Sequence, residues 1–263
     1  MVSQFYFFRE SQLSDLLTLR KYILVVNPYK DLDKGKKAQV ALMFNNIARK
    51  YDFLNHFLSL GIDKLWRKKA IKLLRSHQPK RMLDIATGTG DFAIAALKLN
   101  PDSVVGIDIS TEMLAVGREK IAKKGLENKI QLFEGDSENI RFDNNSFDAI
   151  TVAFGVRNFE NLEKGISEMY RVLDKGGKLV VLEFSKPRKF PIKQIYNFYF
   201  FKILPFCGRI VSKDMSAYTY LPESVENFPD GDKFLEICKS CGFNTVKEQR
   251  LSFGIASIYI GTK

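Results

Sequence analysis

The sequence of 263 residues is poor in the side chains that hold metals or build disulfide frameworks. It has three cysteines and two histidines. Three cysteines are too few for a disulfide framework and leave one thiol unpaired. The Cys238-x-x-Cys241 pair invites a zinc or redox interpretation, but neither His56 nor His77 has a spacing to it that would complete the ligand set of a zinc site. We therefore expect no metal centre, a buried structural pair at Cys238 and Cys241, and a reducing cytoplasmic location.

Long hydrophobic runs are also absent. No stretch reaches the roughly eighteen apolar residues that a membrane-spanning helix requires. Arg9, Glu10 and Asp15 interrupt the N-terminal region where a secretion leader would place its apolar core, so we expect no leader.

Acidic residues are the smaller charged class, 30 against 41 basic residues, and the 22 phenylalanines are a high count. The resulting net charge of +11 suits nucleic acid or an anionic bilayer, or serves only solubility. No RNA-binding signature accompanies the charge, and the basic residues are scattered through amphipathic segments. We therefore expect no nucleic-acid partner and a transient, peripheral contact with the inner face of the cell membrane.

Residues 1–37 differ from the rest of the chain. Apolar patches at 5–8 and 22–26 are followed by a charged run at 30–37 that we expect to be solvated. This extension is a flexible arm, an interfacial helix or a mistranslated upstream region, and the sequence leaves these three open. Residues 38–263 show no internal repeat and no domain-scale linker, so we expect them to form a single domain.

The first part of that domain has a helical pattern. Apolar residues recur at spacings of three and four from Val40 to Tyr51, and a second such pattern runs from Leu65 to Leu74. We expect these helices to form a cover over the ligand site, with Tyr51 and Asn55 facing a substrate. The alternative is core packing for Tyr51 and a helix cap for Asn55.

Short apolar segments then alternate with helical patterns. We expect strands at 82–85, 104–109, 130–133, 147–153 and 178–184, with helices at 92–98, 112–123 and 162–173. Such alternation predicts a Rossmann-like α/β fold with a mainly parallel sheet. Ligands bind at the carboxyl ends of parallel strands, so the loops at 87–91, 108–113, 135–138 and 153–158 should converge on one cleft.

The C-terminal part begins with a densely aromatic and basic stretch at 190–206, which could be a lid, an interfacial helix or a buried core helix. We expect Tyr218–Ser224 to lie in a loop and residues 231–241 to form a helix. The last two apolar segments, 243–249 and 251–260, have no helix between them and should form an antiparallel hairpin at the sheet edge.

The glycine-rich turn after the first strand is the candidate ligand site. Gly88-x-Gly90-x-x-Ala93 fits the relaxed dinucleotide fingerprint, and Asp108 lies where a ribose-binding acid is expected. Asp84 and Asp91, however, place carboxylates where a dinucleotide would put its pyrophosphate, and they would repel it. S-adenosyl-L-methionine carries sulfonium and ammonium charges instead. The turn therefore favours this methyl donor over NAD.

Several motifs together resemble those of class I S-adenosylmethionine-dependent methyltransferases: LDIATGTGD at 83–91, VGIDIS at 105–110, GDSE at 135–138 and DNNSFD at 143–148. Other stretches narrow the likeness. The segments at 43–69, 152–161 and 168–187, together with SAYTYLPESV and FPDGD, are similar to the quinone-biosynthesis C-methyltransferases of the UbiE/MenG type. The resemblance runs from about Val40 to the C-terminus.

This resemblance implies methyl transfer from S-adenosylmethionine to a ring carbon of demethylmenaquinol, giving menaquinol in menaquinone biosynthesis. The alternatives are a ubiquinol precursor or another lipid or phenolic acceptor. The implied partner is a prenylated quinol substrate. A homodimer is a further expectation for the assembly, and the sequence leaves the oligomeric state open. An NAD-dependent enzyme and a basic RNA-associating protein remain rival interpretations.

The resemblance also implies roles for single residues. The donor-binding set is Asp84, Gly88, Thr89, Gly90, Asp108, Asp136 and Ser137. Within it, Thr89 would touch the donor, Asp108 would hold the ribose hydroxyls, and Asp136 with Ser137 would bracket the adenine. Two positions depart from the family pattern: Ala153 stands where a serine is common, and Thr87 where a cysteine or glycine is usual.

The chemistry defines what the catalytic residues must do. The acceptor carbon must lie about 3 Å from the sulfonium methyl, in line with the C–S bond. A quinone ring is too electron-poor to attack, whereas a quinol that loses a hydroxyl proton is nucleophilic. We expect Arg157 and Asn158 to stabilise the phenolate and Tyr51 to orient the ring from the opposite wall. A structural salt bridge is the alternative for Arg157, and no general base stands out, so a water could serve.

Overall fold

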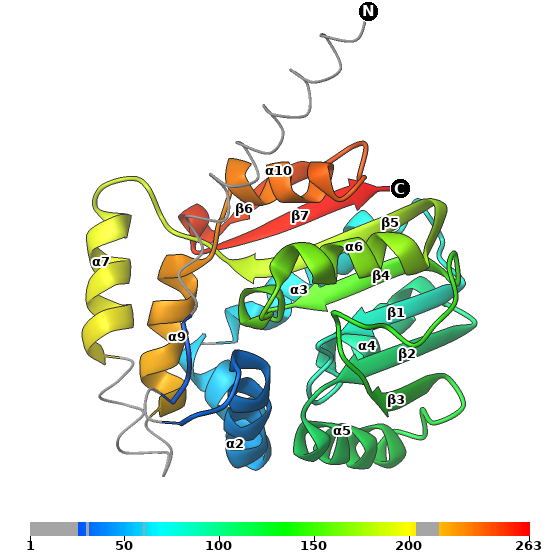
Figure 1. Cartoon of the computed structure of the whole chain (residues 1–263), viewed down its shortest axis with the longest axis horizontal. Helices are drawn as coiled ribbons and strands as arrows, with labels where there is room; N and C mark the ends of the chain where they lie inside the picture. The colour runs from blue at the N-terminus through cyan, green and yellow to red at the C-terminus, as the bar shows by residue number, and fades with distance from the viewer. Residues whose placement is uncertain (1–25, 30–31, 60, 204–215) are drawn as a thin grey trace, which may run out of the picture.

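The computed structural model describes residues 26–29, 32–59, 61–203 and 216–263, and its described strands form one sheet in the order β3-β2-β1-β4-β5-β7-β6 (Figure 1). The strands are β1 Arg81–Ile85, β2 Ser103–Asp108, β3 Ile130–Glu134, β4 Phe147–Ala153, β5 Leu173–Phe184, β6 Lys247–Leu251 and β7 Ala256–Thr262. Strands β1 to β5 pair in parallel, and β7 pairs antiparallel with both β5 and β6. The predicted mainly parallel sheet with a C-terminal antiparallel hairpin is confirmed.

Helices cover both faces of the sheet. One face carries α3 Ile62–Leu73, α4 Asp91–Ala96 and α5 Thr111–Lys123, and the other carries α6 Leu162–Val172 and α10 Asp232–Ser240 (Figure 1). Trp66, Phe92 and Leu114 pack against the first face. Ile166 and Phe234 pack against the second, so each face has its own apolar core.

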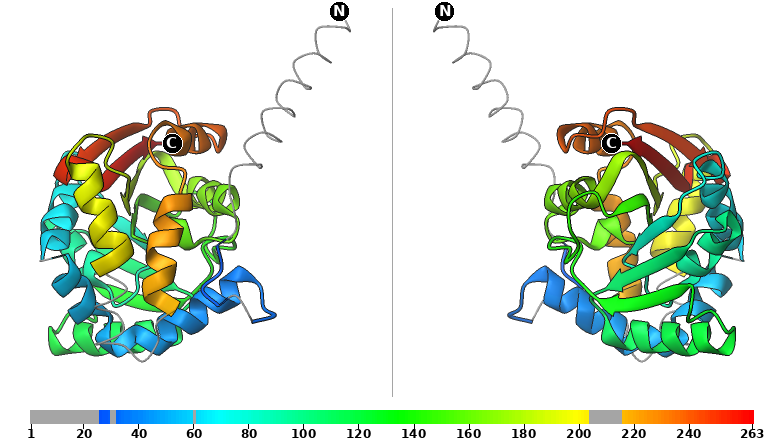
Figure 2. Two further views of the ribbon diagram at one scale, coloured as in Figure 1. Left: turned by 90° about the vertical axis from the view of Figure 1, so that its left-hand side faces the viewer. Right: turned by 90° about the vertical axis from the view of Figure 1, so that its right-hand side faces the viewer.

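A further layer stands over the carboxyl ends of the parallel strands. It consists of α2 Lys36–Leu58, α7 Ile192–Phe198 and α9 Ser216–Asn227 (Figures 1 and 2). Helix α2 contacts α3, α5 and α9, so the predicted N-terminal helical cover is present. In Figure 1 the arrows of β4 and β5 point toward this layer, which places it over the predicted ligand cleft.

The prediction of a loop at Tyr218–Ser224 is wrong, because this segment is part of helix α9. Its composition, which includes a proline within the helix, argues against a helix on local propensity. Tyr220 packs with Val40 and Met43 of α2, and Val225 packs with Tyr196 and Phe200 of the α7 segment. Tertiary packing therefore overrides the local preference.

Other boundaries shift by a few residues. Strand β5 begins at Leu173 instead of 178, and the hairpin strands begin later than the predicted 243 and 251. Phe243 is 2% exposed and packs edge-on against Tyr170, which makes it a core anchor before the strand. Phe253 and Gly254 have positive φ angles and interrupt the extended backbone between β6 and β7.

The aromatic stretch at 190–206 forms helix α7 followed by a π-helical turn, Tyr199–Ile203, and its remainder lies outside the described residues. Tyr196 and Phe200 are buried, whereas Ile195 is 61% and Phe198 62% exposed. A fully buried core helix is therefore excluded for this stretch. Among the described helices, none is both long enough and apolar enough to cross a membrane. Residues 1–25 make up most of the N-terminal extension and lie outside the described residues. The three interpretations of the extension therefore stay open.

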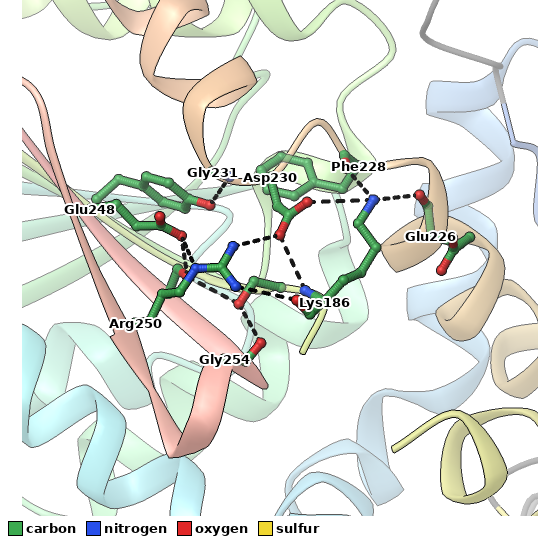
Figure 3. Close-up of polar contacts among 11 residues, drawn as sticks. Lys186, Glu226, Phe228, Asp230, Gly231, Glu248, Arg250 and Gly254 are labelled. Atoms are coloured by element: carbon green, nitrogen blue, oxygen red, sulfur yellow. Dashed lines mark hydrogen bonds and ion pairs between the residues drawn. The ribbon is translucent and has the colours of Figure 1, made fainter. Parts of the chain in front are cut away.

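A polar network fastens the connection between α9 and α10 to the sheet (Figure 3). The Asp230 carboxylate accepts the backbone N–H of Lys186 at 3.2 Å and lies 3.3 Å from the Arg250 guanidinium. The Lys186 ammonium donates to the carbonyls of Glu226 at 2.8 Å and Phe228 at 3.2 Å. The network joins the end of α9 to β6 and to the loop after β5, and so fixes the helix that bears Tyr218 and Tyr220.

Replacing Asp230 tests this network. The side chain is 8% exposed, so Asp230→Ala leaves the Arg250 and Lys186 donors without their acceptor, and we expect the free energy of unfolding to fall by about 2 kcal/mol. Glu236→Ala, at an exposed carboxylate on α10, is the matched control and should stay within about 0.5 kcal/mol of the parent. Urea unfolding measures both, and equal losses would contradict the anchoring role.

Candidate active site

A cavity opens where β1, β2, β3 and β4 end. It is lined by Gly88 after β1, by Asp108 of β2, by residues 135–138 after β3, by Ala153 at the end of β4 with residues 154–155 after it, and by Tyr51 of α2. The open space between these residues is about 620 Å³, including the part that faces solvent. We call it the strand-end cavity. The predicted convergence of four loops on one cleft is confirmed.

Asp108 is held in place by the backbone of the glycine turn. Its two carboxylate oxygens accept the N–H groups of Gly88 and Ser110, each at 2.8 Å. Gly88 has φ 57°, a left-handed conformation that glycine adopts without a steric penalty. Burial raises the pKa of Asp108, while the two N–H groups oppose the shift. The carboxylate is thus oriented at the wall of the cavity before any ligand arrives.

Two side-chain-bearing residues at the strand ends are also left-handed. Ala86 after β1 has φ 51° and Phe154 after β4 has φ 59°, and both line the strand-end cavity. Such conformations cost energy in non-glycine residues and cluster at functional sites. A Cβ atom at Gly155 would lie 2.6 Å from the Ala86 Cβ, so the two turns pack too tightly for any side chain there.

Asp84 is fully buried and lies behind the strand-end cavity instead of in its lining. Its carboxylate accepts the hydroxyls of Thr87 at 2.6 Å and Thr151 at 2.7 Å. Burial raises its pKa to about 6, and the two hydroxyls limit the shift. Thr87, which departs from the family pattern, thus supplies a hydrogen bond that stabilises the turn.

Thr89 and Gly90 also lie outside the lining of the cavity. The Thr89 hydroxyl donates to Asp52 at 2.6 Å, and Lys120 forms ion pairs with both Asp52 and Asp91, the latter at 2.7 Å. Asp91, which the sequence placed beside the ligand, is likewise outside the lining and is paired with a lysine of α5. Donor contacts by Asp84, Thr89 and Gly90 stay predictions.

Other carboxylates supply the negative charge that the sequence assigned to Asp91. The acidic residues that line the strand-end cavity are Asp108, Asp136, Glu138 and Glu160. Ser137 lines it as well. Lys37 of α2 lies 2.7 Å from Asp136 and 3.2 Å from Glu138, and it is the basic residue in the described lining. The balance remains acidic and favours a cationic ligand.

A second cavity adjoins the first, and Phe44, Tyr51 and Phe154 line both. Its remaining apolar and aromatic lining is Met43, Ile47, Phe184, Ala217, Tyr218, Tyr220 and Leu221. Its polar groups include Arg157 of the turn after β4 and Arg67 of α3. We call it the aromatic cavity.

Arg157 forms the structural salt bridge that the sequence offered as the alternative to a phenolate-stabilising role, which stays a prediction. Its Nη1 lies 2.8 Å from a Glu183 carboxylate oxygen and also donates to the Phe154 carbonyl. The Glu183 side chain is 0% and the Arg157 side chain 7% exposed, so the structural salt bridge exists and is buried. Arg157 nevertheless lines the aromatic cavity, and its Nε has no hydrogen-bond partner among the described residues.

The three predicted catalytic residues are brought together around both cavities. Asn158 lines the strand-end cavity, Arg157 the aromatic cavity, and Tyr51 both. The Asn158 amide donates to the Phe154 carbonyl at 3.3 Å, and its side-chain oxygen is unpartnered within the described chain. Burial raises the pKa of Tyr51, while the nearby Arg157 charge lowers it.

Sequence reasoning missed a lysine that supports the turn bearing Arg157. Lys36, expected to be solvated, is 8% exposed, and its ammonium donates to the carbonyls of Phe159 at 2.8 Å and Arg157 at 3.3 Å. Burial lowers its pKa to about 8. The charged run around it gives no local signal for this role, because the contacts are more than a hundred residues away in sequence.

Arg67 and Asp63 were also missed. They form a buried ion pair one helical turn apart on α3, and both line the aromatic cavity. The Arg67 Nε has no hydrogen-bond partner within the described chain. The spacing of four was visible in the sequence, but it is equally typical of an exposed helix face.

The cysteine pair belongs to the core, as predicted. Cys238 of α10 is 1% exposed, Cys241 is half-buried, and both are free thiols. Burial raises the pKa of Cys238 to about 12, which leaves the thiol protonated and inert at neutral pH. Within the described chain no group of three histidine, cysteine, aspartate or glutamate residues could hold a metal ion.

The buried carboxyl of Asp84 predicts a pH-dependent stability. Because its pKa rises from 3.8 to about 6 on folding, the folded protein keeps a proton that the unfolded chain releases, and stability is lost as the pH rises from about 4 to about 6. Asparagine does not ionise, so the stability of Asp84→Asn does not fall over this pH range. The variant should therefore gain about 3 kcal/mol relative to the parent across that window, measured by urea unfolding without ligand at several pH values. A difference in unfolding free energy that stayed constant with pH would contradict the raised pKa of Asp84.

Comparison with known proteins relates this site to characterised families. The profile of the ubiE/COQ5 methyltransferase family matches residues 32–263. The demethylmenaquinone methyltransferase of Bacteroides fragilis is 50% identical over 239 residues, which cover 90% of this chain and 97% of that protein. The ubiquinone/menaquinone biosynthesis C-methyltransferase UbiE of Geotalea daltonii is 45% identical over 237 residues, covering 89% of this chain and 100% of that protein.

Solved structures agree on the fold. An S-adenosylmethionine-dependent methyltransferase of Thermotoga maritima, described as a possible histamine N-methyltransferase, has a TM-score of 0.59 at 21% identity over 84% of this chain and 99% of its own. Phosphoethanolamine N-methyltransferase 2 of Haemonchus contortus, solved with S-adenosylmethionine, has a TM-score of 0.51 at 18% identity over 70% of this chain and 48% of its own. With the fold of S-adenosylmethionine-dependent methyltransferases and a sequence match over nearly its whole length, the chain belongs to the ubiE/COQ5 methyltransferase family.

Proposed function

We propose that the protein transfers a methyl group from S-adenosylmethionine to a ring carbon of demethylmenaquinol, giving menaquinol. The observation that carries this proposal is the pair of adjoining cavities. An acid-lined cavity at the strand ends suits a cationic donor, and an aromatic cavity with a buried arginine suits a phenolic ring. The two share Phe44, Tyr51 and Phe154, so the methyl group would cross between ligands at this boundary.

The donor would lie in the strand-end cavity with its ribose hydroxyls on Asp108 and its adenine beside Asp136 and Ser137. The carboxylate of Asp108 is already aimed by two backbone N–H groups, so binding requires little reorganisation. Asp136 is held by Lys37 at 2.7 Å, which fixes its position at the rim. Gly88 allows the ligand to approach the backbone closely.

The acceptor ring would lie in the aromatic cavity between the aromatic side chains and Arg157. Loss of a hydroxyl proton makes the quinol a phenolate, whose negative charge the Arg157 guanidinium stabilises through donors that Glu183 does not occupy. The ring carbon then attacks the methyl group in line with the C–S bond. The bonding pair stays on sulfur, S-adenosylhomocysteine leaves, and the ring carbon loses its proton to water and regains aromaticity. The phenolate oxygen then takes up a proton from water, which gives the quinol.

The names of the relatives support a prenylated quinol as the acceptor. The relatives at 44 to 50% identity from Bacteroides fragilis and Porphyromonas gingivalis are named demethylmenaquinone methyltransferases, which favours the menaquinol reaction. A ubiquinol precursor is the second candidate, because relatives such as the Geotalea daltonii protein are named for both quinones. Either acceptor is membrane-embedded, so we infer a cytoplasmic enzyme with transient contact at the inner face of the membrane. A homodimer remains a proposal for its assembly.

An acceptor panel tests the function. The purified protein with S-adenosylmethionine and chemically reduced demethylmenaquinone should yield a product heavier by one methylene, detected by mass spectrometry. The oxidised quinone should give none, and reduced ubiquinone precursors or simple phenols should react more slowly. Methylation of another phenol alone would overturn the choice of acceptor.

Calorimetry tests the donor site separately. S-adenosylhomocysteine should bind and NADH should not. Asp108→Ala removes a charged acceptor of the ribose hydroxyls, so the affinity for S-adenosylhomocysteine should fall by about 10- to 100-fold. Asp174→Ala, at a carboxylate outside both cavities, is the control. Binding of NADH in place of S-adenosylhomocysteine would contradict the proposed methyl-donor site.

A paired substitution tests Arg157. Arg157→Ala alone would leave Glu183 buried without its partner, at a cost of about 3–5 kcal/mol, and so would confuse folding with catalysis. The double variant Arg157→Gln/Glu183→Gln keeps shape and hydrogen bonds without charge. We expect its turnover number to fall about 100-fold, with the affinity for S-adenosylhomocysteine within about twofold of the parent.

The control for this pair is Arg171→Gln/Glu168→Gln, which neutralises an ion pair of α6 outside both cavities and should leave turnover unchanged. Normal turnover of the Arg157/Glu183 double variant would show that the arginine is structural only.

A further inference from the structure

Helix α7 and the turn after it present apolar side chains to the outside of the molecule. These side chains are between 39% and 81% exposed: Phe190, Ile195, Phe198, Phe201 and Ile203. We call this surface the α7 face. Large apolar groups gathered in one short segment are unusual on the surface of a soluble protein and mark an interaction site. No residue of the α7 face lines either cavity.

The charge along the segment that bears the α7 face has a single sign, although Glu226 of the adjacent α9 is exposed nearby. From Ser185 to Lys213 the sequence contains no aspartate or glutamate. The exposed basic residues of its described part are Arg188, Lys189, Lys193 and Lys202. An apolar helical face bordered by lysine and arginine is complementary to an anionic lipid bilayer, because the apolar groups enter the acyl boundary while the cations meet the headgroups.

The inner side of the same segment packs on the wall of the aromatic cavity. Tyr196 and Phe200 are buried against α9, and the Phe200 ring lies 5.9 Å from that of Phe184, centroid to centroid. Phe184 and Leu221 line the aromatic cavity. Figures 1 and 2 show α7 side by side with α9, over the strand ends. One layer of side chains thus separates the α7 face from the proposed acceptor site.

We propose that the α7 face docks the protein on an anionic lipid bilayer, so that the aromatic cavity lies next to the membrane. Docking itself needs only the apolar groups and the basic border. Its purpose, the direct uptake of a prenylated acceptor from the bilayer, rests on the proposed function. The charge favours lipid over a second copy of this chain as the occupant, since two copies would bring two basic borders together.

Vesicle cosedimentation tests the docking. The full chain should bind vesicles rich in phosphatidylglycerol and bind pure phosphatidylcholine vesicles weakly. In Ile195→Ser/Phe198→Ser/Phe201→Ser the partition coefficient should fall at least about tenfold. Phe133→Ser is the matched control, because Phe133 is 45% exposed on β3 at the opposite edge of the sheet, and it should bind as the parent does.

A charge variant tests the basic border. Lys189→Gln/Lys193→Gln/Lys202→Gln should lose about tenfold or more at low salt, and the difference from the parent should shrink at high salt. The control Lys98→Gln/Lys123→Gln/Lys124→Gln removes the same charge from exposed positions at the ends of α4 and α5. If both triple variants lost binding equally, net charge alone would explain it and the α7 face would be rejected.

A two-substrate assay separates docking from the proposed function. With a short-tailed, water-soluble quinol and no vesicles, the Ile195/Phe198/Phe201 variant should turn over as the parent does. With a long-tailed quinol in vesicles it should be at least about tenfold slower. A parent protein that binds vesicles through the α7 face but methylates no quinol would overturn the proposed function and leave the docking intact.

Two results would overturn the docking. In the first, the Ile195/Phe198/Phe201 variant binds anionic vesicles as well as the parent. In the second, the parent does not bind them and is dimeric by sedimentation, while the variant is monomeric, which would make a second copy the occupant of the α7 face.

Discussion

The buried ion pair of Arg157 and Glu183 is the interaction on which the arrangement of both cavities depends. It joins the turn after β4 to the end of β5, and Glu183 is also held by the backbone N–H of Phe184 at 2.8 Å. A buried pair of this kind adds little net stability, but removing one partner is costly. Its value here is positional. It keeps a permanent cation in an apolar wall, with a carboxylate on one side and an open cavity on the other.

The sequence was sufficient for the sheet and the glycine turn because their signals are local. Apolar runs, helical spacing and the Gly88-x-Gly90 turn each lie within a dozen residues, so the mainly parallel sheet, the edge hairpin and the converging loops followed from general rules of α/β folds. Helix α9 was not predicted, because its tyrosines have a low helix propensity. The helix is stabilised by packing against α2 and α7, which are distant in sequence. Packing between distant segments decides such cases.

The site was predicted less completely, for the same reason. Asp108, Asp136 and Ser137 line the strand-end cavity, as the motifs implied. The sequence attributed part of the negative charge of the site to Asp91, which forms an ion pair with Lys120, whereas Glu138 and Glu160 line the cavity. Lys36 and Arg67 were missed because a lysine or arginine in a helix is usually exposed, and only the fold shows which ones are buried.

Phe44, Tyr51 and Phe154 form a boundary that the two proposed ligands would share. A molecule that orders these rings from one side would change the surface available on the other, so occupancy of either cavity would alter the affinity of its neighbour by one common coupling factor. Saturation curves for donor and acceptor would then be functions of each other's concentration. The wall between the cavities would thereby synchronise the two substrates.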